Sequence, residues 1–334
     1  MTTFSNYALE WEETAITNIG LDFGVLNNRL NGTIEVYDKK TDGILYRPTL
    51  PESLNQFTSP LQNLAGVNNK GLEITLGWND RVGDISYSVS GNFTYNKNKV
   101  TKYKGELVRE WRTDANGKKV WYQNVGTVAN GSSNLIVEGH EMNEYYMMNP
   151  YKGNGSYFNS DGTVNINGGP KDGMIRTEAD MKWLQAMFDA GYKFYPNQAI
   201  GKDKIWYGDM IYADYNGDGI YGNDDDRDFQ GVSWRPKYYF GLQASMTWKG
   251  FDLSMNWAGA AGFKIDYYKQ TQNSVSVTHG YGLGYDIAYD HYFFDPENPN
   301  DPRTNIYSET PRLVGYQNSG QASATSSWHL KNGN

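Results

Sequence analysis

The chain has 334 residues with 30 Lys and Arg against 38 Asp and Glu, so its formal net charge is −8. This negative balance disfavours nucleic acid as a partner, and the lack of cysteine excludes disulfides and thiolate sites. Aromatic residues make up 15% of a chain with a mean hydropathy of −0.71, which predicts a β protein with exposed aromatic side chains.

Hairpins are the first predicted elements. Apolar and polar residues alternate with period 2, which predicts strands with one apolar and one polar face over residues 19–25, 30–36, 72–78 and 85–96. Tight turns rich in Asn, Asp and Gly at 27–28 and 80–84 join these strands in pairs.

A long connection follows, over about residues 101–234, and it contains one predicted helix. Thr177 is expected to cap this helix in a capping box with Asp180, and Gly191 is expected to end it. The helix has an apolar stripe that suits packing on the connection, made by Met181, Leu184 and Phe188.

The last predicted strand pair covers 238–248 and 251–257 and is joined by the turn Lys249-Gly250. A second long connection reaches about residue 327. Beyond it, the segment 328–330 is expected to begin a seventh strand.

The pattern of strands favours an all-β fold, a transmembrane antiparallel β-barrel, over a soluble β-sandwich. Tight turns and long connections alternate strictly, so all turns lie at one end of the sheet. The strands approach or exceed about 12 residues, whereas soluble strands have a mode near 5–6 and membrane-spanning strands need roughly 9–11. Aromatic residues mark the strand ends on the apolar face, as in an aromatic girdle: Trp78, Tyr95, Trp248 and Trp257.

Six strands are too few to close a barrel, because the smallest single-chain barrels have about 8. The chain also starts without the basic and apolar regions of a signal peptide. We therefore expect residues 1–334 to be part of a longer outer-membrane protein, without its first domain and its last strands.

The stretch 214–225, DYNGDGIYGNDD, has the form of an EF-hand calcium loop in its first half. Oxygen ligands are expected at loop positions 1, 3, 5, 7 and 12, which are Asp214, Asn216, Asp218, Ile220 and Asp225. Asp225 is shorter than the usual Glu and no flanking helices are predicted, so we expect a structural calcium ion and no sensor. The alternative is an Asx turn with solvated carboxylates and no metal.

Aromatic residues in the long connection are candidates for stacking on a substrate: Trp111, Trp121, Tyr122, Tyr145 and Tyr146. Their alternative role is packing within the loops or against a partner. Together with the acidic stretch, they keep open the second hypothesis, a soluble calcium-dependent carbohydrate-binding β-sandwich or adhesin.

Catalysis is not expected. The 4 His residues are scattered without zinc-ligand spacing, and neither a G-x-S-x-G elbow nor a phosphate-binding loop is present. A glycosidase-type carboxylate pair is the one enzymatic arrangement that the sequence leaves open.

An ordered set of motifs runs across nearly the whole chain: NYALEWEET at 6–14, TNIGLDF at 17–23, LNGTIEVYDKKTD at 30–42, LQNLAGVNNKGLE at 61–73, FTYNKNKV at 93–100, VEGHEMNEYY at 137–146, GDMIYADYNGDGI at 208–220, DDR at 225–227, PKYYFG at 236–241, WKGFDLS at 248–254 and SWHLKNG at 327–333. Taken together in this order, these motifs resemble the SusC/RagA-type TonB-dependent transporters. One departure is GHEM at 139–142, which replaces the small and Pro residues of the family and marks a loop tip specific to this protein.

The resemblance implies that residues 1–334 form the C-terminal part of a barrel of about 22 strands, without the plug domain. Such proteins of Bacteroidota import oligosaccharides or peptides across the outer membrane. They work with a SusD-like surface lipoprotein and draw energy from TonB through the N-terminal region. The partners expected from this resemblance are therefore the lipoprotein, TonB, the substrate and outer-membrane lipid.

Overall fold

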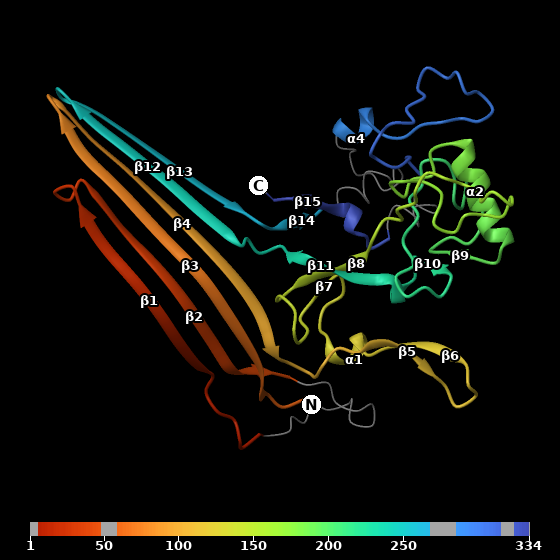
Figure 1. Ribbon diagram of the computed structural model, residues 1–334, viewed down its shortest axis with the longest axis horizontal. Coiled ribbons are helices and arrows are strands. Elements are labelled where there is room, and N and C mark those ends of the chain that lie inside the picture. Colours follow the sequence, from red (N-terminus) through yellow and green to blue (C-terminus); the bar gives the residue numbers. More distant parts are fainter. Residues whose placement is uncertain (1–5, 48–58, 268–284, 315–323, 334) are drawn as a thin grey trace.

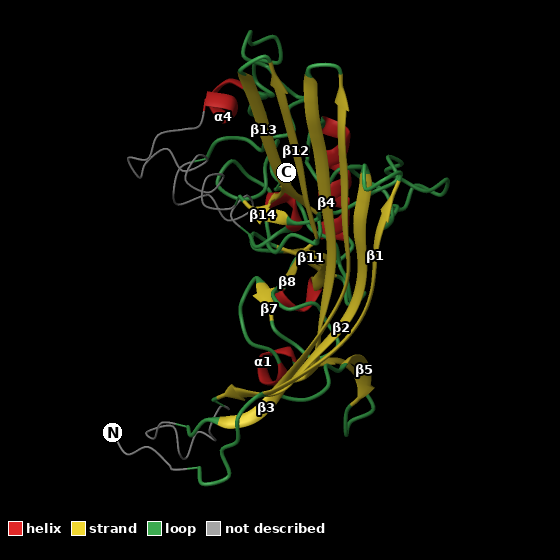
Figure 2. Ribbon diagram, turned by 90° about the vertical axis from the view of Figure 1, so that its left-hand side faces the viewer, coloured by secondary structure: helices red, strands yellow, loops and turns green. Residues whose placement is uncertain are grey.

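The computed structural model describes residues 6–47, 59–267, 285–314 and 324–333. Its main feature is one long, curved antiparallel sheet with the strand order β1-β2-β3-β4-β12-β13 (Figures 1 and 2). Its six strands are β1 (Glu13–Val25), β2 (Leu30–Tyr46), β3 (Gln62–Val82), β4 (Ile85–Lys102), β12 (Tyr238–Trp248) and β13 (Phe251–Ala261). These are the six strands that the alternation predicts, and most extend beyond the predicted limits.

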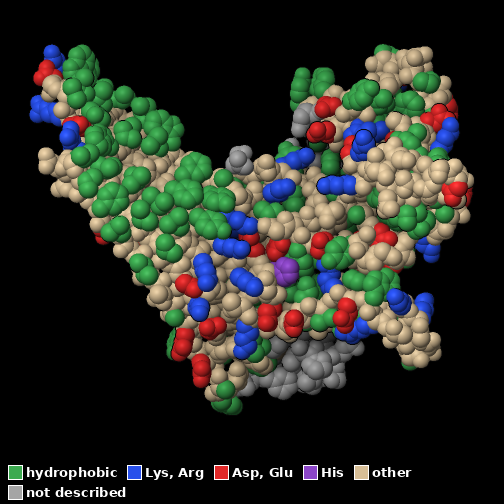
Figure 3. Space-filling view, viewed as in Figure 1, with side chains coloured by type: hydrophobic (Ala, Val, Ile, Leu, Met, Phe, Trp, Pro, Cys, Tyr) green, Lys and Arg blue, Asp and Glu red, His purple; other side chains and the backbone are tan. Residues whose placement is uncertain are grey.

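The register of the sheet places apolar side chains in rows on one face. One row runs across five neighbouring strands, because each member is paired with the next: Leu21, Ile34, Ile74, Phe93 and Phe240. The adjacent row on the opposite face is small and polar: Asp22, Thr33, Thr75, Asn92 and Gly241. In Figure 3, hydrophobic side chains gather over the upper part of the sheet, and charged side chains gather toward its lower end. A face of this kind suits contact with lipid.

The tight turns lie together at one end of the sheet, as predicted (Figure 1). In the four-residue turn between Val25 and Leu30, residues Leu26, Asn27 and Asn28 have φ values of 57°, 56° and 62°; in the two-residue turn between β12 and β13, Lys249 and Gly250 have values of 44° and 84°. Two-residue hairpin turns that match the twist of the strands need positive φ at both positions, which Asn and Gly adopt most readily. The expected strand pairing is therefore confirmed.

The connection between β4 and β12 is a packed unit that lies beside the sheet (Figure 1). Its elements are β5 (Arg109–Thr113), β6 (Lys119–Gln123), α1 (Val125–Val128), β7 (Asn134–Leu135), β8 (Glu144–Met148), α2 (Glu178–Asp189), β9 (Lys193–Phe194), β10 (Ile220–Tyr221), η2 (Asp224–Asp226) and β11 (Arg227–Ser233). Helix α2 starts after Thr177, and the predicted capping box with Asp180 is present. The helix buries Trp183, Leu184 and Met187 in the main core of the unit.

The last elements are β14 (Lys264–Asp266), α4 (Tyr285–Tyr289), η4 (Ser327–His329) and β15 (Leu330–Asn332). The expectation that 328–330 begins a seventh barrel strand is wrong, because β15 pairs with β14 and lies outside the six-stranded sheet. Ser326 accepts a hydrogen bond from the backbone of Trp328 and starts a short 3-10 turn there, which interrupts the extended backbone. None of the helices in the described residues is long and apolar enough to cross a membrane.

The sheet is part of a barrel and is not closed: β1 and β13 are its outer strands in the described part of the chain. A β-sandwich needs a second sheet of similar extent packed on the first. The other sheets in the described ranges have two or three strands each. The interpretation as a barrel wall is therefore confirmed, and the sandwich is excluded.

Candidate functional site

Two segments of the packed unit come together although they are far apart in the sequence: the hairpin β5–β6 and the acidic loop 214–226. The indole N–H of Trp111 donates a hydrogen bond to the backbone carbonyl of Asn216 at 2.9 Å. The side-chain amide of Gln123 donates to a carboxylate oxygen of Asp225. In the folded chain, the hairpin that carries the predicted stacking residues therefore contacts the loop that carries the predicted metal ligands.

The hairpin presents aromatic rings in two layers. Trp111 and Trp121 lie opposite each other in the register, and their rings meet edge to face at 5.8 Å. On the other layer, the guanidinium of Arg112 lies 3.5 Å from the ring centroid of Tyr122. Trp111 is 42% exposed and Tyr122 is 37% exposed, so both rings can accept a ligand by stacking.

Arg109 holds the hairpin in place. Its buried guanidinium forms an ion pair with Asp228 at 3.0 Å and donates to the backbone carbonyl of Arg227. The same group lies 4.1 Å from the ring centroid of Tyr215, in the acidic loop. Sequence reasoning missed Arg109, because nothing in its neighbourhood indicates a partner more than a hundred residues away.

Tyr145 and Tyr146 are not available to a substrate. They are 4% and 3% exposed, since strand β8 is buried on both sides. The hydroxyl of Tyr145 donates to the carbonyl of Lys264, and that of Tyr146 donates to the side chain of Gln123. Burial raises the pKa of Tyr146 to about 12. The expectation that these two rings stack on a substrate is corrected: they pack the unit.

The acidic loop is organised by Asx turns. The carboxylate of Asp214 accepts a hydrogen bond from the backbone N–H of Gly219 at 2.8 Å. The side-chain oxygen of Asn216 accepts from the N–H of Asp218 at 3.0 Å, and Asp218 accepts from Ile220 at 2.8 Å. This is the arrangement that the metal-free interpretation describes.

Asp226, one residue beyond the predicted ligand Asp225, closes the loop. It is buried and accepts hydrogen bonds from the backbone N–H groups of Tyr215, Gly222 and Asn223 at 2.7, 2.8 and 3.1 Å. Burial raises its pKa to about 7, while these three bonds act in the opposite direction. A signal for this role was present in the sequence, since Asp226 stands three residues after Asn223, the spacing of a capping box.

Within the described ranges, no three His, Cys, Asp or Glu side chains gather in a group that could hold a metal ion. Asp214, Asn216 and Asp218 supply oxygens of the kind that calcium prefers, from one turn. Asp225 lies in the next element and is bonded to Gln123. The calcium site therefore stays a prediction.

Comparisons with known proteins bear on both the sheet and the unit beside it. Residues 1–125 match the family model described as TonB dependent receptor-like, beta-barrel. The chain is 35% identical over 133 residues to the TonB-dependent receptor SusC of Bacteroides thetaiotaomicron, which covers 37% of this chain and 13% of SusC. It is 29% identical over 170 residues to the TonB-dependent receptor P39 of Formosa agariphila, which covers 47% of this chain and 16% of P39.

Among solved structures, a chain of the RagAB peptide transporter superposes with a TM-score of 0.60 at 16% identity. The superposition covers 99% of this chain and 28% of that chain, so the whole fold described above, including the packed unit, has a counterpart there. This chain therefore spans between about an eighth and just over a quarter of the length of these relatives.

A curved sheet with one apolar face and a packed unit on its long connections defines the class as an outer-membrane β-barrel, and residues 1–125 are similar to the barrel of the TonB-dependent receptors. The similarity to SusC and the fold shared with a chain of the RagAB peptide transporter agree with the expected resemblance to the SusC/RagA type.

Proposed function

We propose that the protein to which this chain belongs imports oligosaccharides or peptides across the outer membrane with energy from TonB. The observation that carries this proposal is the barrel wall itself, six long strands with a lipid-facing apolar row and a small polar row opposite. The similarity to SusC supports the class of activity. Because the fold is shared with the RagAB peptide transporter, peptides remain a candidate cargo in addition to oligosaccharides.

A surface lipoprotein of the SusD type is part of the proposal, as is contact with TonB through residues outside this chain. The packed unit between β4 and β12 is the surface on which we place the lipoprotein. Its size and its own hydrophobic cores support such a role, because a rigid platform suits docking better than a mobile loop.

The exposed rings of the β5–β6 hairpin are proposed as a platform for passing cargo. Trp111 and Tyr122 are partly exposed, Arg112 lies over one face of Tyr122, and Trp121 supports Trp111 from the partner strand. Sugars and peptide side chains both stack on such rings, so the platform suits either cargo. A structural calcium ion in the neighbouring acidic loop is proposed as a clip that holds the loop to the hairpin.

Uptake by living cells tests the function. A strain that lacks the gene is expected to lose growth on one class of polymer, either polysaccharide or protein, as the only carbon source. Growth should return with the intact gene and should not return when TonB is absent. Unchanged growth and unchanged uptake of labelled oligosaccharides and peptides in the deletion strain would refute the proposal.

A further inference from the structure

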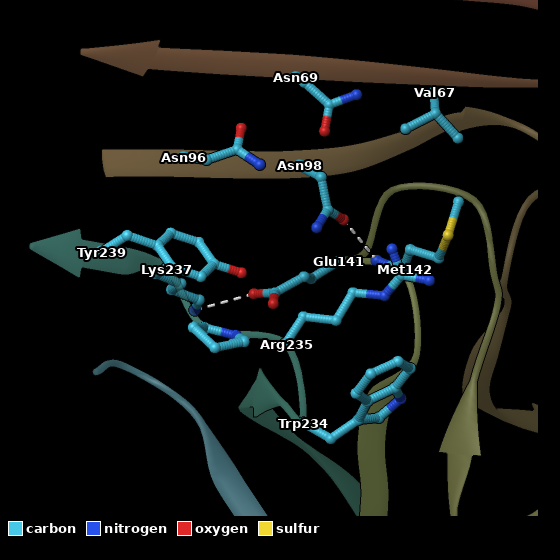
Figure 4. A pocket seen from close by; sticks show the side chains of 11 residues that line it. Val67, Asn69, Asn96, Asn98, Glu141, Met142, Trp234, Arg235, Lys237 and Tyr239 are labelled. Atoms are coloured by element: carbon cyan, nitrogen blue, oxygen red, sulfur yellow. Dashed lines mark hydrogen bonds and ion pairs between the residues drawn. The ribbon is translucent and has the colours of Figure 1, made fainter. Parts of the chain in front are cut away.

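A hollow of about 420 Å³ lies at the end of the barrel wall from which the long connections leave. Its floor is made by side chains on the polar face of three neighbouring strands, Val67, Asn69, Asn96, Asn98 and Tyr239. Its rim is made by the loop tip 141–142 and the segment 234–237 (Figure 4). The hollow is therefore built from the wall and from two separate segments of the packed unit.

The frame of the hollow is rigid. Glu141 forms an ion pair with Lys237 at 2.8 Å and accepts a hydrogen bond from the hydroxyl of Ser233 at 2.8 Å. The backbone N–H of Met142 donates to the side chain of Asn98 at 2.8 Å, which fixes the loop tip on strand β4. These contacts satisfy the carboxylate of Glu141 and neutralise the charge of Lys237.

Other polar groups in the hollow have no such partners. The side chains of Asn69, Arg235 and Tyr239 make no hydrogen bond or ion pair within the described part of the chain, and Tyr239 is about half exposed. The guanidinium of Arg235 lies 5.0 Å from the ring centroid of Trp234, whose ring is also about half exposed. The hollow thus presents one unpaired cation on an aromatic surface, beside a free amide and a free phenol.

The charges of the lining do not cancel. Arg235 and Lys237 are cations, Glu141 is the only anion among the lining residues, and the pair of Glu141 and Lys237 leaves Arg235 uncompensated. Guanidinium groups bind carboxylates through two parallel hydrogen bonds, and an aromatic ring below the guanidinium keeps its plane oriented for this. A neutral ligand would leave Arg235 without a counter-charge.

We propose that this hollow binds a single carboxylate group of the imported cargo, with Arg235 as its partner. Asn69 and Tyr239 bind the polar groups next to the carboxylate, and Trp234 covers its carbon skeleton. The carboxylate belongs either to the free C-terminus of a peptide or to an acidic sugar of the uronic acid type. This inference rests on the proposed function, because it concerns the cargo of the same pore.

Calorimetric titration of the purified full-length protein in detergent tests the inference. The probes are tetra-alanine and its C-terminal amide, and tetragalacturonate and neutral maltotetraose. At least one carboxylate probe is expected to bind, and more tightly than its neutral counterpart. Arg235→Gln should weaken that binding about tenfold or more, because it removes a charged hydrogen-bond partner, and should leave the neutral probes unaffected.

Arg303→Gln is the matched control, because it removes the same charge from an exposed Arg of another loop, one that does not line the hollow. Its binding should equal that of the unaltered protein. Binding of tetra-alanine alone identifies a peptide C-terminus as the ligand, binding of tetragalacturonate alone identifies an acidic sugar, and binding of both identifies the carboxylate itself as sufficient.

Three results would overturn the subsite: no binding of either carboxylate probe, equal binding of acid and neutral probes, or equal binding by Arg235→Gln and the unaltered protein. These results are separate from the test of import. If import persists together with any of these three results, the proposed function is supported and the subsite is refuted. If the protein binds carboxylates through Arg235 but does not import them, the subsite is supported and the proposed function is refuted.

Discussion

At the scale of single residues, buried charges in the packed unit are matched by partners from distant parts of the chain. Asp209 is 2% exposed, and both its carboxylate oxygens accept hydrogen bonds from the guanidinium of Arg312 at 3.0 and 2.9 Å. Burial raises the pKa of Asp209, and the charge of Arg312 opposes this rise. Arg312 also donates to the carbonyl of Lys202, so it ties the segment 285–314 to the packed unit.

Replacing Arg312 should therefore destabilise the folded packed unit. Arg312→Ala leaves a buried carboxylate without a partner, and we expect a loss of about 3–5 kcal/mol in the free energy of unfolding of the unit. Calorimetry and hydrogen exchange over residues 202–209 would measure this loss. Lys182→Ala is the control, since its ion pair with Glu178 is exposed on both sides and contributes little to stability. Equal effects of the two changes would contradict the assignment.

Calcium is the second prediction at this scale. Adding calcium should raise the melting temperature of the purified protein, by an amount that corresponds to about 2.7 kcal/mol when calcium exceeds its Kd about a hundredfold. The double change of Asp214→Asn and Asp218→Asn should abolish the rise, because Asn keeps the turn and removes the charge. Asp161→Asn, in another Asx turn, should leave the rise intact. A melting curve that neither calcium nor chelator moves would remove the metal from the loop.

Residue-level prediction from sequence succeeded where the signal is local. The cap of Thr177 and Asp180 depends on spacing alone and is present as predicted. The roles of Tyr145 and Tyr146 depend on burial, which sequence spacing does not reveal. The hydroxyl of Tyr145, for example, donates to the carbonyl of Lys264, more than a hundred residues away. Two residues of the unusual tip 139–142, Glu141 and Met142, line the hollow, and its specificity for this protein stays a prediction.

At the scale of elements, the β5–β6 hairpin is the part of the unit that depends most on a few contacts. A two-stranded hairpin is marginally stable at best on its own in water. This hairpin is secured by Trp111 on Asn216, by Gln123 on Asp225 and by Arg109 on Asp228. Its position near the acidic loop therefore follows from these side chains.

Trp111→Ala should loosen the hairpin and leave the sheet unaffected. The change removes one hydrogen bond and one edge-to-face contact, which together are worth about 1–3 kcal/mol. Hydrogen exchange should become faster over residues 109–123 and stay constant in β3 and β4. The control is Lys119→Ala, at an exposed position of the same hairpin. Unchanged exchange in Trp111→Ala would show that the indole does not secure the hairpin.

At the scale of the whole molecule, the alternation of side chains decides which face meets lipid. In β13, Met255 lies on the apolar face opposite Ala244, and its neighbour Ser254 lies on the polar face opposite Ser245. The hydroxyl groups of Ser245 and Ser88 are 2.8 Å apart, which continues the polar face across the sheet. Adjacent residues of one strand thus face lipid and the interior of the pore.

Met255→Arg and Ser254→Arg should therefore differ strongly. An arginine on the lipid face near the middle of the bilayer costs about 2–4 kcal/mol, whereas one on the interior face is tolerated. The amount of folded protein in the outer membrane, read from its shifted mobility on unheated gels, should fall for Met255→Arg only. A similar fall for both variants would contradict the assignment of faces.

The wall of the barrel was predictable because period-2 alternation and tight turns are local signals, as in 85–96 and at Asn27 and Asn28. The packed unit was not predictable beyond helix α2. Its cores combine residues from short, irregular segments, such as Ile175, Phe194 and Ile205, which show no periodicity. The failure at 328–330 has the same origin, because a side-chain cap on the backbone outweighed the strand propensity of three residues.

Strands β4 and β12 are paired along eleven positions, although residues 103–237 stand between them. The two strands thus pair as directly as two strands joined by a short turn. The contents of this insertion can therefore be exchanged, lengthened or reshaped between related proteins without shifting the register of any strand. The wall and the insertion are therefore separable in structure, because this one segment can be replaced while β4 and β12 keep their pairing.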